Sequence, residues 1–254
     1  MSIKTTVKVK NVELGTGMPK ICVSITGRNL DEILKQAKEI KNSPVDIAEW
    51  RVDYYEDASV IDIVIATLQK LSKVLGDCPI LFTFRRKAEG GEKEISPEDY
   101  KSLNLKVIES GLADLIDIEL FVGDELVTEV VEAAHKNDVK AVISNHDFTK
   151  TPDKKEMLVR LRKMQELGGD IPKIAVMPQS EKDVITLLSV TEEFHREYAD
   201  RPFITISMSK MGLVSRLAGG VFGSAMTFGA VGEVSAPGQM EAGKLREVLK
   251  LFGE

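Results

Sequence analysis

The sequence predicts an α/β protein, a (β/α)8 TIM barrel, on three observations. Eight short apolar runs rich in β-branched residues recur along the chain, and helical patterns separate them. Successive runs begin 24 to 34 residues apart, which is the length of one strand, one helix and two loops. The runs are continuous rather than alternating, which indicates parallel strands covered on both faces. An open, doubly wound sheet is the alternative that this pattern leaves.

The predicted strands follow one another without a change in composition between them. They begin near Lys20, Val45, Pro79, Ala113, Val139, Ile171, Pro202 and Met226. No segment rich in proline, glycine or serine divides the chain, and one such barrel commonly takes about 250 residues. We therefore expect residues 1–254 to form a single barrel domain.

Helices are predicted between the strands. In residues 30–40, for example, apolar residues recur at every third or fourth position, as on one face of a helix. Ser96 and Thr151 each precede a proline and predict helix starts, because a hydroxyl caps the first turn and proline suits the first helical position. The segment 4–17 precedes the first unit and predicts a short N-terminal β-hairpin that closes the barrel floor.

The charge balance argues against a nucleic-acid-binding protein. Acidic residues number 40 and basic residues 34, for a net charge of −6, whereas nucleic-acid binders usually carry a basic surplus. The N-terminal residues lack the apolar core of a signal peptide, and no run of 18 apolar residues occurs. Cys22 and Cys78 are expected to be reduced thiols. These features predict a cytoplasmic enzyme that binds neither membrane nor nucleic acid.

Polar residues gather where the predicted strands end, which is where barrels of this kind build their active sites. The set comprises Glu49, Arg51, Arg85, Glu89, Glu119, Asn145, His146, Asp147, Ser207, Ser209 and Lys210. Charges there are costly to bury unless they are paired or functional. One interpretation is a catalytic or binding site. The other is that Glu49, Arg51, Arg85 and Glu119 form a satisfied layer of ion pairs that closes the barrel.

His146 is the histidine best placed for chemistry. His135 and His195 lie in polar helical segments and are expected at the surface, whereas His146 directly follows an apolar run. That position would put it at the barrel mouth, and an imidazole exchanges protons near neutral pH. Glu89 could reach the ring and fix its tautomer. A satisfied core histidine is the alternative.

Lys173 stands inside a predicted strand, between Ile171 and Ile174. If its side chain points into the barrel, burial and nearby arginines would favour the free amine, which is a nucleophile. If instead it belongs to the first, exposed residues of the strand, it lies at the barrel floor, because Pro172 directly precedes it. The spacing of residues does not choose between these two positions.

No cofactor motif is recognisable. The chain has no histidine–cysteine spacing typical of zinc, and Gly219–Gly223 does not follow a strand as a dinucleotide-binding loop would. A divalent-metal site made of carboxylates alone is the alternative that this pattern leaves, although no spacing indicates one.

Five longer segments carry a family resemblance: LFTFRRKAEGGE at 81–92, VISNHDF at 142–148, IPKIAVMPQS at 171–180, SRLAGGVFGSAMTFGA at 215–230 and SAPGQ at 235–239. In order and spacing they resemble the type I 3-dehydroquinate dehydratases of the shikimate pathway. The resemblance implies a homodimeric (β/α)8 lyase without metal or cofactor. It further implies dehydration of 3-dehydroquinate to 3-dehydroshikimate, the third step of chorismate and aromatic amino acid biosynthesis, through a Schiff base.

The resemblance also implies roles for individual residues. Lys173 would form the Schiff base, His146 would be the general acid and base, and Glu89 would be its partner. Substrate binding would fall to Ser24, Glu49, Arg51, Arg85, Arg216, Ser235 and Gln239, with Arg216 on the substrate carboxylate. Phe148, Met208 and Phe228 would supply apolar walls.

Two rival functions suit the same pattern. A Schiff-base aldolase would also use a lysine in the sixth strand, and would bind a phosphate at the loops after the seventh and eighth strands. A barrel without catalytic activity could serve as a binding or scaffold protein. Turnover of a sugar phosphate would indicate the first, and absence of any turnover the second.

Overall fold

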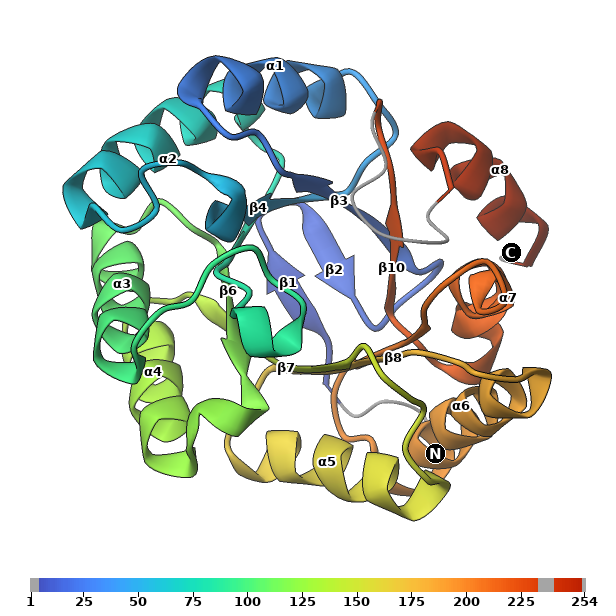
Figure 1. The fold of residues 1–254 in the computed structure, drawn as a ribbon. Coiled ribbons are helices and arrows are strands. Elements are labelled where there is room, and N and C mark those ends of the chain that lie inside the picture. Colours follow the sequence, from blue (N-terminus) through green and yellow to red (C-terminus); the bar gives the residue numbers. More distant parts are fainter. Residues whose placement is uncertain (1–4, 233–239, 253–254) are drawn as a thin grey trace.

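Eight parallel strands form the inner wall of the molecule, and helices surround them (Figure 1). The computed structural model describes residues 5–232 and 240–252. The strands are β3 (Lys20–Ile25), β4 (Ile47–Arg51), β5 (Ile80–Thr83), β6 (Leu115–Glu119), β7 (Lys140–Asp147), β8 (Ile171–Val176), β9 (Ile204–Ser207) and β10 (Met226–Gly229). Their order in the sheet, β10-β3-β4-β5-β6-β7-β8-β9, follows the chain and pairs β10 back onto β3. The (β/α)8 prediction is confirmed, and the open doubly wound sheet is wrong.

The barrel closes where β9 meets β10. Ala225 donates its backbone N–H to the carbonyl of Phe203 at 2.8 Å. Thr205 donates its backbone N–H to the Ser224 hydroxyl at 3.2 Å. A serine side chain thus takes the place of a backbone acceptor at this seam.

Helices alternate with the strands and form the outer ring in Figure 1. They are α1 (Leu30–Lys41), α2 (Ile61–Leu75), α3 (Pro97–Ser110), α4 (Asp124–Lys136), α5 (Lys154–Glu166), α6 (Glu181–Glu193), α7 (Leu213–Ala218) and α8 (Ala242–Phe252). Short 3-10 turns are η1 (Val52–Tyr54), η2 (Lys87–Glu89), η3 (Leu120–Val122) and η5 (Gly219–Phe222), and η4 (Phe194–Tyr198) is a π-helical turn. Within the described residues, no helix has the length and apolar character needed to cross a bilayer.

One predicted helix start is confirmed and one is wrong. The Ser96 hydroxyl accepts the backbone N–H of Asp99 and caps α3. The cap of α5 is Asp153 rather than Thr151, because the Asp153 carboxylate accepts the N–H of Glu156. Thr151 instead donates its hydroxyl to the carbonyl of Met177.

An antiparallel hairpin closes the floor of the barrel, as the sequence predicts. Its strands are β1 (Val7–Val9) and β2 (Val12–Leu14), and Figure 1 shows them across the barrel axis. The hairpin's buried side chains pack against the lowest inward residues of the barrel strands. Those residues are Cys22, Ile47, Leu81, Leu115, Val142, Ile171, Ile204 and Met226.

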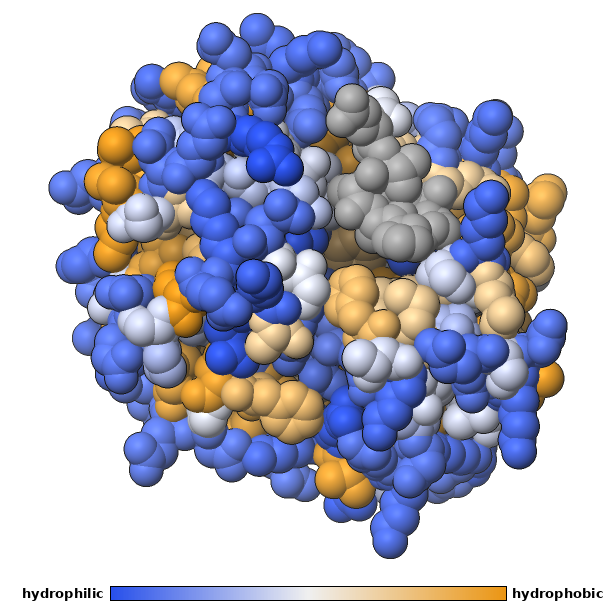
Figure 2. Space-filling model, in the orientation of Figure 1, coloured by the Kyte–Doolittle hydropathy of each residue, from blue (hydrophilic) through white to orange (hydrophobic). Residues whose placement is uncertain are grey.

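On several strands the inward side chains change from apolar at the floor to polar or charged at the carboxyl end. On β4 the apolar Ile47 is followed by Glu49 and Arg51, and on β8 Ile171 is followed by Lys173. On β9 and β10 the inward side chains stay apolar. The polar side chains thus concentrate toward the carboxyl ends of the strands. In Figure 2 hydrophilic side chains cover most of the face seen in Figure 1, and apolar ones form separate patches.

We expect Leu14→Ala to lower the free energy of unfolding by about 2–5 kcal/mol, because it leaves a cavity under the barrel. Leu14 has no exposed surface. Urea denaturation measures the change, and Glu13→Ala on the exposed face of the same strand is the control, expected within about 0.5 kcal/mol of the parent. Equal losses in both variants would show that the hairpin does not plug the barrel.

Candidate active site

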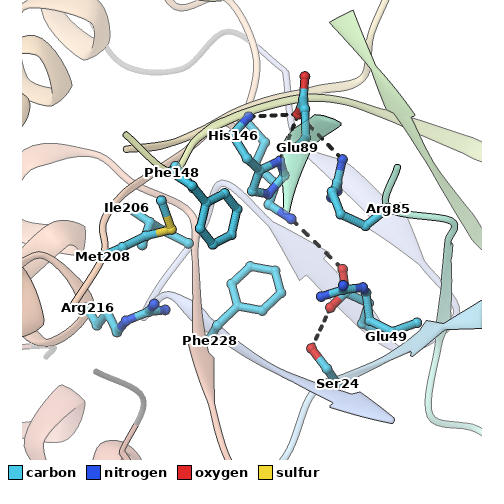
Figure 3. A pocket seen from close by; sticks show the side chains of 13 residues that line it. Ser24, Glu49, Arg85, Glu89, His146, Phe148, Ile206, Met208, Arg216 and Phe228 are labelled. Carbon is cyan, nitrogen blue, oxygen red and sulfur yellow. Dashed lines mark hydrogen bonds and ion pairs between the residues drawn. The ribbon is translucent and has the colours of Figure 1, made fainter. Parts of the chain in front are cut away.

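A pocket opens at the carboxyl ends of the strands, and almost every strand contributes to it (Figure 3). Its lining consists of Ser24, Glu49, Arg51, Arg85, Glu89, His146, Phe148, Lys173, Ala175, Ile206, Met208, Arg216 and Phe228. All but two of the site residues that the family resemblance implies meet here. The other two, Ser235 and Gln239, lie outside the described residues. The polar residues at strand ends that do not line the pocket are Glu119, Asn145, Asp147, Ser207, Ser209 and Lys210. Ala175 and Ile206 were missed, although each lies two positions from a predicted residue on the same face of its strand.

Lys173 points into the barrel and not to its floor. Its register on β8 places it two residues above Ile171, and only 3% of it is exposed. Its Nζ atom lies 3.9 Å from Glu49 Oε1 and 3.7 Å from Asp117 Oδ2. Two carboxylates thus lie within 4 Å of the amine. Arg85, one of the arginines expected nearby, binds the other oxygen of Asp117 at 2.7 Å.

Two further contacts complete the surroundings of the lysine. Nζ lies 4.5 Å from the centre of the Phe228 ring, a distance at which an aromatic face attracts a cation. Glu49 accepts hydrogen bonds from the hydroxyls of Ser24 and Thr83 as well. The amine is thus held between a carboxylate that is itself fixed and an aromatic ring.

Below the pocket, Arg85 joins two buried acids. It donates to Asp117 Oδ1 at 2.7 Å and to Glu119 Oε1 at 3.0 Å. Burial raises the pKa of Asp117, but Arg85, Lys173 and a hydrogen bond from Ser144 outweigh it and hold this pKa below its ordinary value. Asp117 remains the charged partner of both cations.

The ion-pair interpretation of the sequence is therefore right in part. Arg85 and Glu119 are paired, as it required, whereas Arg51 binds Asp53 through two bonds of 2.8 Å. Asp117 was missed by sequence reasoning. An acid two positions before Glu119, between Ile116 and Ile118, was the available signal, because alternate residues of a strand share one face.

His146 and Glu89 meet at the mouth of the barrel. Glu89 Oε2 lies 3.2 Å from His146 Nδ1 and accepts the backbone N–H of His146 at 2.8 Å. Burial lowers the pKa of His146, and Arg85, Lys173 and Arg51 lower it further. The imidazole is therefore neutral and able to accept a proton. Because Nδ1 faces a carboxylate, Nε2 is the free basic nitrogen.

Arg216 is a pocket cation for which the described residues supply no counter-ion. It extends from α7, only 4% of it is exposed, and burial lowers its pKa to about 10. Among the described residues it has no ion pair, and its Nε atom has no hydrogen-bond partner. Figure 3 shows it across the pocket from Glu49 and Glu89. A buried guanidinium without a counter-ion is an attractive site for a carboxylate or phosphate ligand.

Apolar side chains separate Arg216 from the acids. Phe228, Met208 and Ile206 are buried, whereas Phe148 is 42% exposed at the pocket mouth. The Phe148 ring lies against Gly90, where a Cβ atom would come within 2.3 Å of it. Gly90 has a φ of +82°, so this position favours glycine on both counts.

The remaining histidines and the cysteines lie away from the pocket. His135 is exposed, as predicted, and its Nε2 atom lies 2.9 Å from Asp170. His195 is partly buried, which corrects the expectation of a surface position. Cys22 and Cys78 are free thiols, and burial raises the pKa of both. Within residues 5–232 and 240–252, no three His, Cys, Asp or Glu side chains are grouped to hold a metal ion.

The arrangement supplies four chemical functions in one partly closed space. It holds an amine, a neutral imidazole with a carboxylate partner, hydroxyl and carboxylate acceptors, and a cation without a partner among the described residues. An amine can condense with a ketone or aldehyde, and an adjacent base can then remove a proton next to that carbon. The pocket is thus suited to an anionic carbonyl compound.

Comparison with known proteins gives consistent results. A family model described as type I 3-dehydroquinase matches residues 21–254. The chain is 56% identical to the 3-dehydroquinate dehydratase of Clostridioides difficile over 98% of both chains, and 54% identical to that of Clostridium botulinum over 99% of both. A crystal structure of the Clostridium difficile type I enzyme with covalent modified comenic acid superposes with a TM-score of 0.96, at 56% identity over 98% of both chains.

We expect Arg216→Met to raise the free energy of unfolding by roughly 1–3 kcal/mol, because it replaces an uncompensated buried charge with an apolar side chain of similar length. Urea denaturation without ligand measures this. Arg162→Met, at an exposed arginine, should stay within about 0.5 kcal/mol of the parent. A clear loss of stability in Arg216→Met would contradict the view that this cation is unpaired.

A second expectation concerns pH. Burial raises the pKa of Glu89 to about 7 from its ordinary 4.5, with Arg85 opposing and Glu119 adding to the rise. The fold therefore binds this proton more tightly than the unfolded chain. The stability it contributes is complete below pH 4.5 and is lost as the pH rises through 7.

The Glu89→Gln variant should not show this loss of stability with rising pH, because glutamine does not titrate. From pH 4.5 to pH 7.5, the stability of the parent should fall relative to the variant by about 1–3 kcal/mol. Urea denaturation at both pH values measures the difference, and His146 titrates in both proteins, so its contribution largely cancels. A pH-independent difference would mean that Glu89 is ionised throughout.

Proposed function

The chain belongs to the type I 3-dehydroquinase family, and from this premise we propose that it dehydrates 3-dehydroquinate to 3-dehydroshikimate through an imine on Lys173. One observation carries the mechanism: a buried amine shares its pocket with a His146–Glu89 pair. The covalent modified comenic acid named with the Clostridium difficile relative is compatible with covalent chemistry in such a pocket.

Substrate recognition follows from the distribution of charge. Arg216 would bind the substrate carboxylate, because a guanidinium makes two parallel charge-assisted bonds with a carboxylate. Ser24, Glu49, Arg51 and Arg85 line the opposite side, where they would bind the ring hydroxyls. Phe148, Met208 and Phe228 would contact the ring carbons. Ser235 and Gln239 stay predictions for the same substrate.

The covalent step begins at the substrate ketone. Lys173 would give one proton to His146, and the free amine would add to the carbonyl carbon. His146 would return this proton to the carbonyl oxygen, which would leave as water and give an iminium ion. The iminium attracts the electron pair released when a neighbouring C–H bond breaks. Glu49 and Asp117, at 3.9 and 3.7 Å from Nζ, are placed to balance the positive charge.

Proton transfer would then pass through His146. As a neutral base it would take the proton from the carbon next to the iminium, and the electron pair would form an enamine. The protonated ring would return that proton to the leaving hydroxyl, which departs as water as the ring double bond forms. Water would finally hydrolyse the imine and free Lys173. Positioned acid–base catalysis of this kind contributes typically about 10²–10⁴ in rate.

Four further properties remain proposals. From the resemblance we infer that the reaction serves as the third step of chorismate and aromatic amino acid biosynthesis and that the protein is a homodimer. From the sequence patterns we infer a cytoplasmic location and a single barrel domain spanning residues 1–254.

We expect Lys173→Ala to reduce turnover of 3-dehydroquinate by about 10³-fold or more, because the electron sink is lost. Absorbance of the conjugated product measures turnover. Borohydride added with substrate should reduce the imine to a secondary amine, and peptide mass mapping should place the adduct on Lys173. Lys210→Ala is the control and should keep both turnover and adduct. Normal turnover in Lys173→Ala, or an adduct on Lys210, would overturn the proposed mechanism.

A further inference from the structure

A path of four interacting polar side chains leads from the outer helix α5 to the imidazole of His146. Arg160 Nη1 donates to Asn145 Oδ1 at 2.6 Å, and Asn145 Nδ2 donates to Glu89 Oε1 at 3.1 Å. The other oxygen of Glu89 lies 3.2 Å from His146 Nδ1. Arg160 and Asn145 do not line the pocket, so any effect they have on the reaction passes through Glu89.

Arg160, at the outer end of this path, is held in place by two contacts. Arg160 forms an ion pair with Glu156, one turn earlier on α5. Its guanidinium also lies 5.2 Å from the centre of the Phe121 ring. Only 13% of the Arg160 side chain is exposed, and only 3% of Asn145. Such a buried and doubly anchored guanidinium has little freedom to leave Asn145.

Donor and acceptor chemistry fixes the direction of the hydrogen bonds along this path. A guanidinium has only donors, so the amide of Asn145 must turn its oxygen toward Arg160. Its NH2 group then faces Glu89, where it can only donate. A donor favours the ionised carboxylate, and an ionised Glu89 favours the His146 tautomer with the proton on Nδ1. The basic Nε2 atom is then free.

We propose that Arg160 and Asn145 are positioning residues that keep Glu89 oriented and ionised, and thereby keep His146 in its basic tautomer. This proposal rests on the proposed function, in which His146 moves the protons. Without Arg160, the Asn145 amide could rotate and present its oxygen to Glu89. That orientation would repel the ionised carboxylate and favour its protonated form.

Other charged groups also influence the protonation of Glu89 and His146. Glu89 faces Arg85, Glu119 and His146 itself, whereas His146 is influenced by Arg85, Lys173 and Arg51. Arg85 opposes protonation of Glu89, and burial and Glu119 promote it. Loss of the Asn145 donor leaves these in place and shifts the balance toward the protonated acid. The acid limb of the kcat/KM profile should then move to higher pH.

The test compares Arg160→Met with Arg162→Met. Both arginines lie on α5, and each stacks on an aromatic ring, but Arg162 contacts Tyr198. We expect Arg160→Met to lower kcat for 3-dehydroquinate about 10-fold or more, with KM changed less than about 2-fold, because substrate contacts remain. The acid limb of the kcat/KM profile of Arg160→Met should move to higher pH by about one unit. Arg162→Met should match the parent.

Two further variants separate positioning from general damage. Arg160→Lys keeps a side chain that only donates, so it should recover kcat to within about 3-fold of the parent. In a Glu89→Gln background, Arg160→Met should cause little additional loss, because its effect passes through Glu89. If the losses of kcat multiply in the double variant, or if Arg160→Lys has no higher kcat than Arg160→Met, the proposal is overturned.

A spectroscopic measurement keeps this proposal separate from the proposed function. The chain has three histidines, so the ¹⁵N signals of the His146 ring can be assigned by comparison with His146→Asn. Above pH 7, where Glu89 is mostly ionised in the parent, we expect a proton on Nδ1 in the parent and a mixture of tautomers in Arg160→Met. An unchanged tautomer, together with kinetics like those of Arg162→Met, would overturn the positioning role. Failure of the parent to convert 3-dehydroquinate would instead overturn the proposed function.

Discussion

The arrangement of this pocket depends on one constraint, the cost of burying charged groups inside a closed barrel. Lys173 is 3% exposed, and an isolated ammonium there would be strongly disfavoured. Glu49 and Asp117 compensate it, and Asp117 is in turn held by Arg85. Each buried group thus fixes the next one. The apolar floor below, sealed by the β1–β2 hairpin, keeps this network from spreading to the other end of the barrel.

The charges below the pocket are paired, whereas one cation at its side is not paired within the described residues. Asp117 and Glu119 share Arg85, and Lys173 and Arg86 are their further cations. Arg216 has no ion pair among the residues the structure describes. The paired layer provides rigidity, and the unpaired cation provides binding energy for an anion. A substrate carboxylate would supply the missing charge. His146, whose pKa is lowered by burial and by neighbouring cations, is the group that we propose to carry protons in this pocket.

Sequence patterns located the site well because its residues follow strand runs directly. Glu49 and His146 were singled out from their places at the ends of apolar strands, whereas the pattern left two positions open for Lys173. Asp117 was missed because an acid within an apolar run looked like an interruption, although its two-residue spacing from Glu119 places both on the inner face. Arg160 could not be found in this way. It lies on an outer helix, and only the fold brings it to Asn145.

The sequence by itself determined the eight strand–helix units, the hairpin and the residue types at the strand ends, because these follow from local periodicity and chain order. The tertiary structure decided where the Lys173 side chain points. A slip of one residue in the β7–β8 register would turn it from the barrel interior to the helices, and that register is set by pairing between distant segments. The same long-range pairing brings two carboxylates within 4 Å of the amine. Distances between charges on different strands arise only when the barrel closes.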